Sequence, residues 1–164
     1  MAIPSEKAIM EKSQARLLTG ADILIEELFN QDVNFIFGHP GGAIMPVYDS
    51  IYQYKDRVQH VLFAHEQSAV HAAAGYSRRN YNKKIGVCMA TSGPGALNFV
   101  TGLGDAYKDS TGLVAITGQV PTNLIGTDAF QETDTFGVTM PVTKHNYIVK
   151  DVRDLPRIIR EAFY

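Results

Sequence analysis

The sequence has very little cysteine, since Cys88 is the only one among 164 residues. A single cysteine excludes an intrachain disulfide framework and a zinc site built from several thiolates. Such a composition favours a reducing compartment, and we expect a cytoplasmic protein. Cys88 itself lies in an apolar segment, where a cysteine usually behaves as a small buried hydrophobic residue.

The chain also lacks an excess of charge of either sign, and it lacks a long hydrophobic run. Its 15 basic and 17 acidic residues give a formal net charge of −2, so neither nucleic acid nor an anionic membrane is favoured as a partner. The first residues alternate charge and apolarity, unlike a secretory signal or a membrane span. With 45% hydrophobic residues, the chain can bury the core of one compact domain.

Apolar segments alternate with amphipathic ones along most of the chain. Residues 1–16 have little apolar periodicity, so we expect them to form a loose leader. Residues 17–164 are expected to form one domain, whose first helix begins near Thr19, a good N-cap. Strands are predicted at 34–38, 60–64, 85–91, 112–117 and 142–149. Further helices are predicted at 43–54, 66–79, 96–109 and from 154 onward.

This alternation predicts an α/β fold. Because most of the strands are apolar nearly throughout and are each followed by a helix, they fit a sheet without a solvated face. We expect a doubly wound, mostly parallel sheet of about six strands with helices on both faces. Residues 118–140 break the regularity and predict a long functional loop. The last helix has no cap or polar tail, so we expect the chain to be part of a longer protein.

The turns that follow three predicted strands carry the candidate chemistry, because open α/β sheets bind ligands at the carboxyl edge of their strands. GHPGG at 38–42 and TSGPG at 91–95 let the backbone approach a ligand, and Glu66 lies at the end of the strand between them. Neither turn has the spacing of a phosphate-binding glycine loop. A lone carboxylate beside apolar residues suits a weakly basic ring nitrogen, as in a heteroaromatic cofactor.

Plainer interpretations exist for each of these residues. Glu66 could be a helix N-terminal residue favoured by the helix dipole by about 0.3–1 kcal/mol, and the glycines could serve only tight turns. His65 and His71 are spaced differently from the two histidines of H-E-x-x-H, so no metal site is predicted. Asn98 and Gln131 could be surface or capping residues, and Phe130 and Met140 could be core residues.

Several segments between about Leu18 and Tyr164 resemble, in order, the N-terminal pyrimidine-binding domain of thiamine diphosphate enzymes. They are FIFGHPGGAIMPVYDSI, HEQSAVHAAAGY, TSGPGALNFVTGLGDAY, ITGQVPTNLIGTDAFQETD and PVTKHNYIV. The two motifs GQVP and GTDAFQE resemble those of one family in particular, the catalytic large subunit of acetohydroxyacid synthase. This enzyme, also called acetolactate synthase, acts in branched-chain amino acid biosynthesis. The alternatives are a related 2-oxo acid enzyme, of the pyruvate oxidase or glyoxylate carboligase type, and a non-catalytic α/β binding module.

The resemblance implies roles for individual residues. Glu66 would bond N1′ of the cofactor's aminopyrimidine, and Gln131 would reach toward the reacting centre. Two further sets follow from the family's pattern. The pyrimidine pocket would be lined by His39, Pro40, Thr91, Pro94 and Asn98. The channel to the active site would be lined by Gly42, Ala43, Val120, Pro121, Ala129 and Phe130.

The resemblance also implies that this chain is a fragment of a longer, three-domain enzyme. The substrates would be pyruvate and 2-oxobutyrate, joined after decarboxylation of pyruvate on thiamine diphosphate. Mg²⁺ would be bound by a C-terminal domain and FAD mainly by a middle domain, and both domains are absent here. The active site would be shared across a homodimer, a regulatory small subunit would be a further partner, and the 164-residue chain alone would be inactive.

Overall fold

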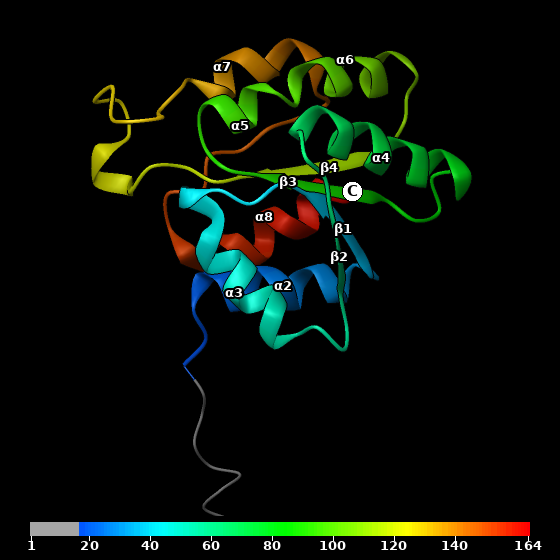
Figure 1. Ribbon diagram of the computed structural model, residues 1–164, viewed down its shortest axis with the longest axis horizontal. Coiled ribbons are helices and arrows are strands. Elements are labelled where there is room, and N and C mark those ends of the chain that lie inside the picture. Colours follow the sequence, from blue (N-terminus) through cyan, green and yellow to red (C-terminus); the bar gives the residue numbers. More distant parts are fainter. Residues whose placement is uncertain (1–16) are drawn as a thin grey trace, which may run out of the picture.

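The computed structural model describes residues 17–164, so the prediction of a loose leader at 1–16 lies outside the described part. Its centre is a parallel sheet of four strands in the order β2-β1-β3-β4. Helices cover both faces of this sheet (Figure 1). The predicted α/β class is therefore confirmed. The strands are β1 (Phe35–Gly38), β2 (Gln59–Leu62), β3 (Gly86–Ala90) and β4 (Leu113–Thr117).

The helices form two layers, one on each face of the sheet (Figure 1). One layer contains α2 (Gly20–Asn30), α3 (Met45–Gln53) and α8 (Leu155–Ala162). The other contains α4 (Glu66–Arg79), α5 (Pro94–Leu97), α6 (Val100–Lys108) and α7 (Thr135–Thr139). Between residues 17 and 164, no helix combines the length and the apolarity that a bilayer span requires. Short 3-10 turns connect the elements at Gly42–Ile44, Thr122–Leu124, Met140–Val142 and Val152–Asp154.

Two sequence predictions about the sheet were wrong. The sheet has four strands and not about six, and the segment predicted as a strand at 142–149 does not pair in the described chain. In that segment, Asn146 Nδ2 donates hydrogen bonds to the Phe136 carbonyl at 2.9 Å and to Thr139 Oγ1 at 3.0 Å. An alternating pattern needs a paired neighbour to become a strand, and here the side-chain bonds of Asn146 tie the segment to α7 instead.

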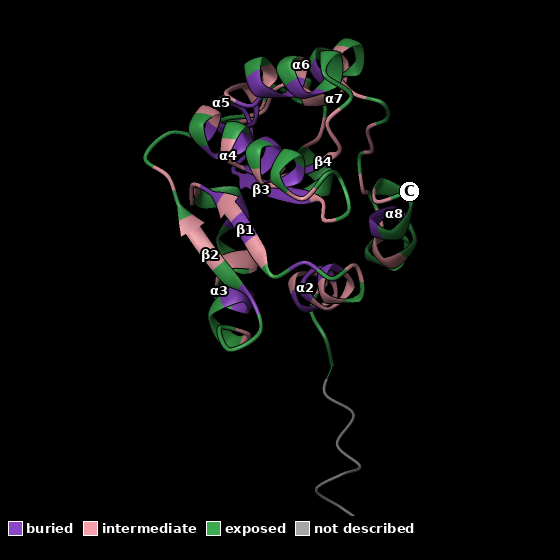
Figure 2. Ribbon diagram, turned by 90° about the vertical axis from the view of Figure 1, so that its right-hand side faces the viewer, coloured by how far each residue is buried: buried purple, intermediate pink, exposed green. Residues whose placement is uncertain are grey.

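The strands also differ in burial, contrary to the expectation that none has a solvated face. β3 is buried at every position because it lies between two strands and two helix layers (Figure 2). β2 is an edge strand, and its last residue, Leu62, is 65% exposed. Apolar composition alone does not distinguish a central strand from an edge strand.

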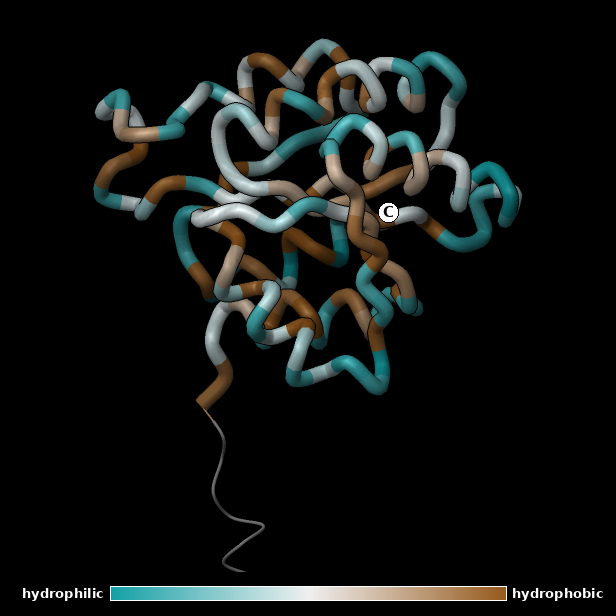
Figure 3. Tube along the Cα trace, viewed as in Figure 1, coloured by the Kyte–Doolittle hydropathy of each residue, from teal (hydrophilic) through white to brown (hydrophobic). Residues whose placement is uncertain are grey.

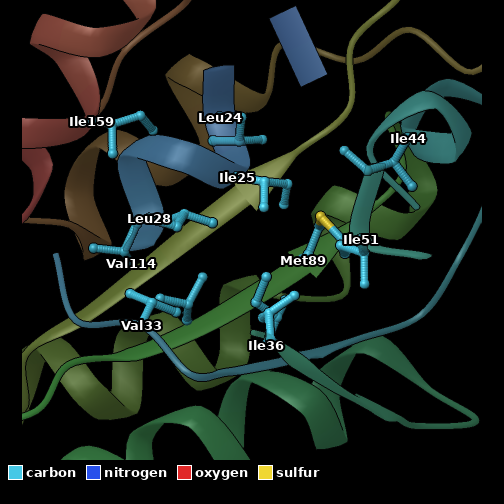
Figure 4. Close-up of a cluster of buried hydrophobic side chains, with 12 residues drawn as sticks. Leu24, Ile25, Leu28, Val33, Ile36, Ile44, Ile51, Met89, Val114 and Ile159 are labelled. Atoms are coloured by element: carbon cyan, nitrogen blue, oxygen red, sulfur yellow. The ribbon is translucent and has the colours of Figure 1, made fainter. Parts of the chain in front are cut away.

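The side chains of β3 alternate between two cores, as the period of a strand requires. Val87 and Met89 contribute to the core beneath α2, α3 and α8 (Figure 4), whereas Cys88 and Ala90 contribute to the core beneath α4 and α6. Hydrophobic and hydrophilic stretches alternate along the tube of the chain (Figure 3). Burial raises the pKa of the Cys88 thiol, so this cysteine is an unreactive core residue.

The first helix begins where the sequence predicts. Thr19 is the N-cap of α2, with its Oγ1 accepting a hydrogen bond from the Asp22 N–H at 3.1 Å. Asp22 returns the bond by accepting from the Thr19 N–H at 3.0 Å, which completes a capping box. Ser50 Oγ also donates to the buried Asp22 carboxylate at 2.9 Å, so the same cap fastens α3 to α2.

The contact between α4 and β3 depends on a glycine. A Cβ atom at Gly86 would lie 2.0 Å from the carbonyl oxygen of Ala73, a backbone atom that cannot move aside alone. We expect Gly86→Ala to lower the free energy of unfolding by about 1–3 kcal/mol through overpacking. Urea denaturation of the 164-residue chain measures this change.

Gly75 provides the matched control for this substitution. It lies in α4 with open space at its Cβ position, so Gly75→Ala should raise the free energy of unfolding by about 0.5–1 kcal/mol. Equal effects of the two substitutions would contradict the packing described for Gly86.

Candidate active site

The parallel strands bring their carboxyl ends, and the turns that follow them, to one edge of the sheet. β1 is followed by His39, β2 by the start of α4, β3 by Thr91, and β4 by Gly118. Ligands of open α/β sheets bind at this edge. The sequence prediction that Glu66 and the two glycine turns share one edge is therefore confirmed.

Glu66 is the first residue of α4 and is 9% exposed. Asn98 Nδ2 donates a hydrogen bond of 2.9 Å to its Oε2. The start of the helix is capped by His65, whose Nδ1 accepts from the Gln67 N–H at 3.2 Å. The helix N-terminus and the Asn98 amide both interact favourably with negative charge on this buried carboxylate.

Thr91 is the point at which the two glycine turns meet. Its Oγ1 accepts a hydrogen bond of 3.2 Å from the Ala43 N–H. A Cβ at Gly41 would lie 2.6 Å from Thr91 Cβ, and one at Gly95 would lie 2.7 Å from Thr91 Cγ2. The same Cβ at Gly95 would stand 3.2 Å from Glu66 Oε1. Glycine at these positions therefore serves the close approach of the turns to Thr91.

The loop that follows β4 reaches the same turns at two points. A Cβ at Gly118 would lie 3.0 Å from Ala43 Cβ. A Cβ at Gly93 would lie 2.2 Å from the Gln131 carbonyl oxygen, and Gly93 has a φ of +51°. The structure thus brings the backbone of Gln131 against the turn after β3, although the two are far apart in the sequence.

The remaining predicted site residues are less closely joined to Glu66. His39 Nδ1 donates a hydrogen bond of 2.7 Å to the Phe63 carbonyl, which links the ends of β1 and β2 and fixes the proton on that nitrogen. Pro40 and Ala129 are partly buried, and Val120 is buried. Phe130 is 88% exposed. The other exposed members of the predicted set are Gly42, Ala43, Pro94, Pro121 and Gln131.

Sequence reasoning missed a half-buried polar pair at this edge. Tyr48 Oη and His60 Nε2 share a hydrogen bond of 3.0 Å, and they pack over Gly38, whose Cβ would lie 3.0 Å from Tyr48 Oη. Burial, and then the negative charge of Glu66, raise the pKa of the Tyr48 phenol. Burial lowers the pKa of the His60 imidazole. Both groups are therefore neutral at pH 7, and the only sequence signal was a histidine within an apolar strand.

No cluster of three or more His, Cys, Asp or Glu side chains suited to a metal ion occurs within residues 17–164. The site consists of one carboxylate, one amide, hydroxyl groups and backbone at glycine turns. Such a donor set suits an organic ligand with a nitrogen that the carboxylate can bond.

Residues 18–138 match the family described as thiamine pyrophosphate enzyme, N-terminal TPP binding domain. The chain belongs to the thiamine pyrophosphate enzymes. The predicted resemblance to the N-terminal domain of these enzymes, whose cofactor is also called thiamine diphosphate, is confirmed. Glu66, Asn98 and both glycine turns lie within the matched residues.

Relatives of this TPP-binding domain are named acetolactate synthase. The chain is 52% identical to the protein from Arthrospira platensis, covering 94% of the chain and 27% of that relative. It is 53% identical to the protein from Mycobacterium leprae, covering 98% and 26%, and 51% identical to the large subunit from Cyanidium caldarium, covering 93% and 26%. The chain therefore spans about a quarter of the length of the curated relatives it matches.

Neighbouring glycines in the first turn should respond differently to alanine. Gly41→Ala should lower the free energy of unfolding by about 1–3 kcal/mol because its Cβ would overlap Thr91. Gly42→Ala has open space at the Cβ position and should change stability by less than about 0.5 kcal/mol. Urea denaturation of both variants checks this difference, and a tolerant Gly41 would disprove the contact with Thr91.

The half-buried His60 should make stability depend on pH. The unfolded imidazole binds a proton below about pH 6.5, whereas burial lowers the pKa of His60 in the folded state. The unfolded state therefore binds more protons, and the free energy of unfolding falls as the pH drops below about 6.5. His60→Gln should reduce this slope in urea denaturation between about pH 7 and 5. An unchanged slope would mean that His60 is accessible to solvent.

Proposed function

We propose that this chain is the pyrimidine-binding domain, residues 17–164, of an acetohydroxyacid (acetolactate) synthase. The whole enzyme would decarboxylate pyruvate and join the two-carbon unit to pyruvate or 2-oxobutyrate in branched-chain amino acid biosynthesis. The observation that carries the proposal is Glu66, buried at the carboxyl edge and bonded to Asn98. The choice of this reaction is supported by the relative from Arthrospira platensis, which is named acetolactate synthase and is 52% identical over 156 residues.

The geometry around Glu66 fits an aminopyrimidine ring. Asn98 occupies one carboxylate oxygen and holds the side chain in place. The other oxygen, Oε1, accepts no hydrogen bond from the side chains or backbone of residues 17–164. A ring nitrogen can therefore share a short charge-assisted hydrogen bond with Oε1.

Thiamine diphosphate, when bound, would supply the electron sink that decarboxylation of a 2-oxo acid requires. Glu66 would hold and move a proton at N1′ of the aminopyrimidine, acting as an acid and base through the ring. The Tyr48 phenol, kept neutral by its raised pKa, adds no second negative charge beside Glu66. The low exposure of Glu66 limits the access of water to its oxygens.

We assign the other predicted residues on the same basis. Thr91 shapes the pocket by holding both glycine turns, with His39, Pro40, Pro94 and Asn98 as further pocket residues. Gln131 would face the reacting centre. The channel would be formed by Gly42, Ala43, Val120, Pro121, Ala129 and Phe130, a set supported by the contact between Ala43 and Gly118.

The whole protein would require parts that lie outside this domain. A C-terminal domain would hold Mg²⁺ and the diphosphate, and a middle domain would hold FAD. The enzyme would be a cytoplasmic homodimer with a shared active site, and a regulatory small subunit would bind it. The 164-residue chain alone should then make no acetolactate.

The deciding experiment uses the protein encoded by the whole reading frame that contains these residues. Acetolactate formation from pyruvate is measured with thiamine diphosphate, Mg²⁺ and FAD present, for wild type and for Glu66→Gln. The variant keeps the shape of the side chain and should lose activity by about 100-fold or more, because general acid–base catalysis contributes at least that much.

Glu26→Gln is the matched control, since Glu26 forms only a surface ion pair with Arg57 at 3.5 Å and should retain full activity. If wild type makes no acetolactate but consumes another 2-oxo acid, the alternative of a pyruvate oxidase or glyoxylate carboligase type holds. Full activity of Glu66→Gln would remove Glu66 from the chemistry.

A further inference from the structure

The segment from Gly126 to Glu132 is wrapped around a carboxylate that sequence reasoning left unassigned. Glu132 Oε1 accepts a hydrogen bond from the Gly126 N–H, and Oε2 accepts from the Thr127 N–H at 3.2 Å and the Ala129 N–H at 3.0 Å. Consecutive backbone N–H groups turned toward one point form an anion-binding concavity. In this protein the anion is a side chain of the loop itself.

The charge of Glu132 is balanced by these backbone groups. The N–H of Gly126 and then that of Ala129 contribute most to lowering the pKa of Glu132, with smaller contributions from Thr127 and Asp128. No lysine or arginine forms an ion pair with Glu132 within residues 17–164. The carboxylate therefore stays ionised near neutral pH and depends on the shape of this loop.

The loop in turn depends on the carboxylate, because its backbone is strained. Asp128 has a φ of +56° and Gln131 has a φ of +58°, and residues other than glycine rarely adopt such positive φ values. The Glu132 N–H also donates to the Ala129 carbonyl at 2.8 Å, which closes a turn with Phe130 and Gln131 at its tip. Such strain persists only when the surrounding bonds fix the conformation.

The strained turn is what brings this loop to the site. The Gln131 carbonyl lies against Gly93, where even a methyl group would not fit, since it would lie 2.2 Å from the oxygen. The same turn holds Phe130 with its side chain 88% exposed. The Gln131 side chain makes no hydrogen bond within the described residues, and the Phe130 side chain has no polar atom. The shape of the backbone therefore fixes where both residues lie.

We propose that Glu132 is a positioning residue, whose carboxylate holds residues 126–132 in the one shape that places Gln131 beside the turn after β3 and Phe130 at the channel. The consequence for catalysis rests on the proposed function. The structural part, that the carboxylate orders the loop, stands independently of it.

The test compares Glu132→Gln with Asp134→Asn. Both substitutions remove one negative charge beside the same hollow, which both residues line. The Asp134 carboxylate accepts one backbone hydrogen bond, from the Gly137 N–H at 2.9 Å, through an oxygen that asparagine retains. A glutamine at 132 instead turns an N–H₂ group toward backbone N–H groups and cannot accept at both ends.

The first readout is the set of amide resonances of Gly126, Thr127 and Ala129 in the 164-residue chain. Amides bonded to a carboxylate should be shifted downfield in wild type and in Asp134→Asn. Glu132→Gln keeps one acceptor oxygen, so it should lose the shift of Gly126, of the Thr127 and Ala129 pair, or of all three. The amides of β3 serve as the control for folding. Unchanged loop amides in Glu132→Gln, or loss of the β3 signals as well, would overturn the proposal.

The second readout is acetolactate formation by the whole protein. Glu132→Gln should lower kcat/KM for pyruvate by about tenfold or more, because small misplacements of site residues cost at least that much, while Asp134→Asn should retain it. Lost loop signals with unchanged kcat/KM would refute the positioning role. Absence of pyruvate turnover in wild type would instead refute the proposed function, and the amide shifts would still test whether Glu132 orders the loop.

Discussion

The close approach of two backbone turns over Thr91 is the constraint on which the site depends. Gly41 and Gly95 both contact this side chain at distances that no Cβ could tolerate, and Ala43 donates to its hydroxyl. Because Gly95 also lies beside Glu66, the position of the carboxylate is linked through Thr91 to the first turn. One threonine and two absent side chains therefore determine the shape of the carboxyl edge.

Near this contact, the negative charge of Glu66 is surrounded by neutral polar groups. Glu66 is buried, yet its partners are an amide and a helix N-terminus, and the nearby Tyr48 and His60 remain neutral. A salt bridge at this place would compete with a ligand for the carboxylate. Neutral partners orient Glu66 while leaving its proton chemistry to whatever binds at the edge.

The loop between β4 and α7 uses the same principle at the surface. Glu132 has no cationic partner in the described chain and is held by backbone N–H groups, which converts a long polar segment into a fixed turn. The loop then reaches the site through backbone contacts with Gly93 and Ala43, because Gln131 and Gly118 lie against these residues. Loops that carry function gain precision when such local bonds limit their conformations.

By itself the sequence determined the α/β class, the strands β1 to β4 and the Thr19 cap. It also determined that Glu66 shares an edge with the glycine turns. These features follow from local periodicity and turn chemistry. The tertiary structure alone decided that β2 is an edge strand, that the helix predicted at 96–109 is interrupted at Asn98 and Phe99, and that 142–149 stays unpaired. It alone joined Tyr48 to His60 and Gln131 to Gly93. Periodicity describes neighbours along one element, whereas pairing partners and close backbone approaches depend on which elements meet in space.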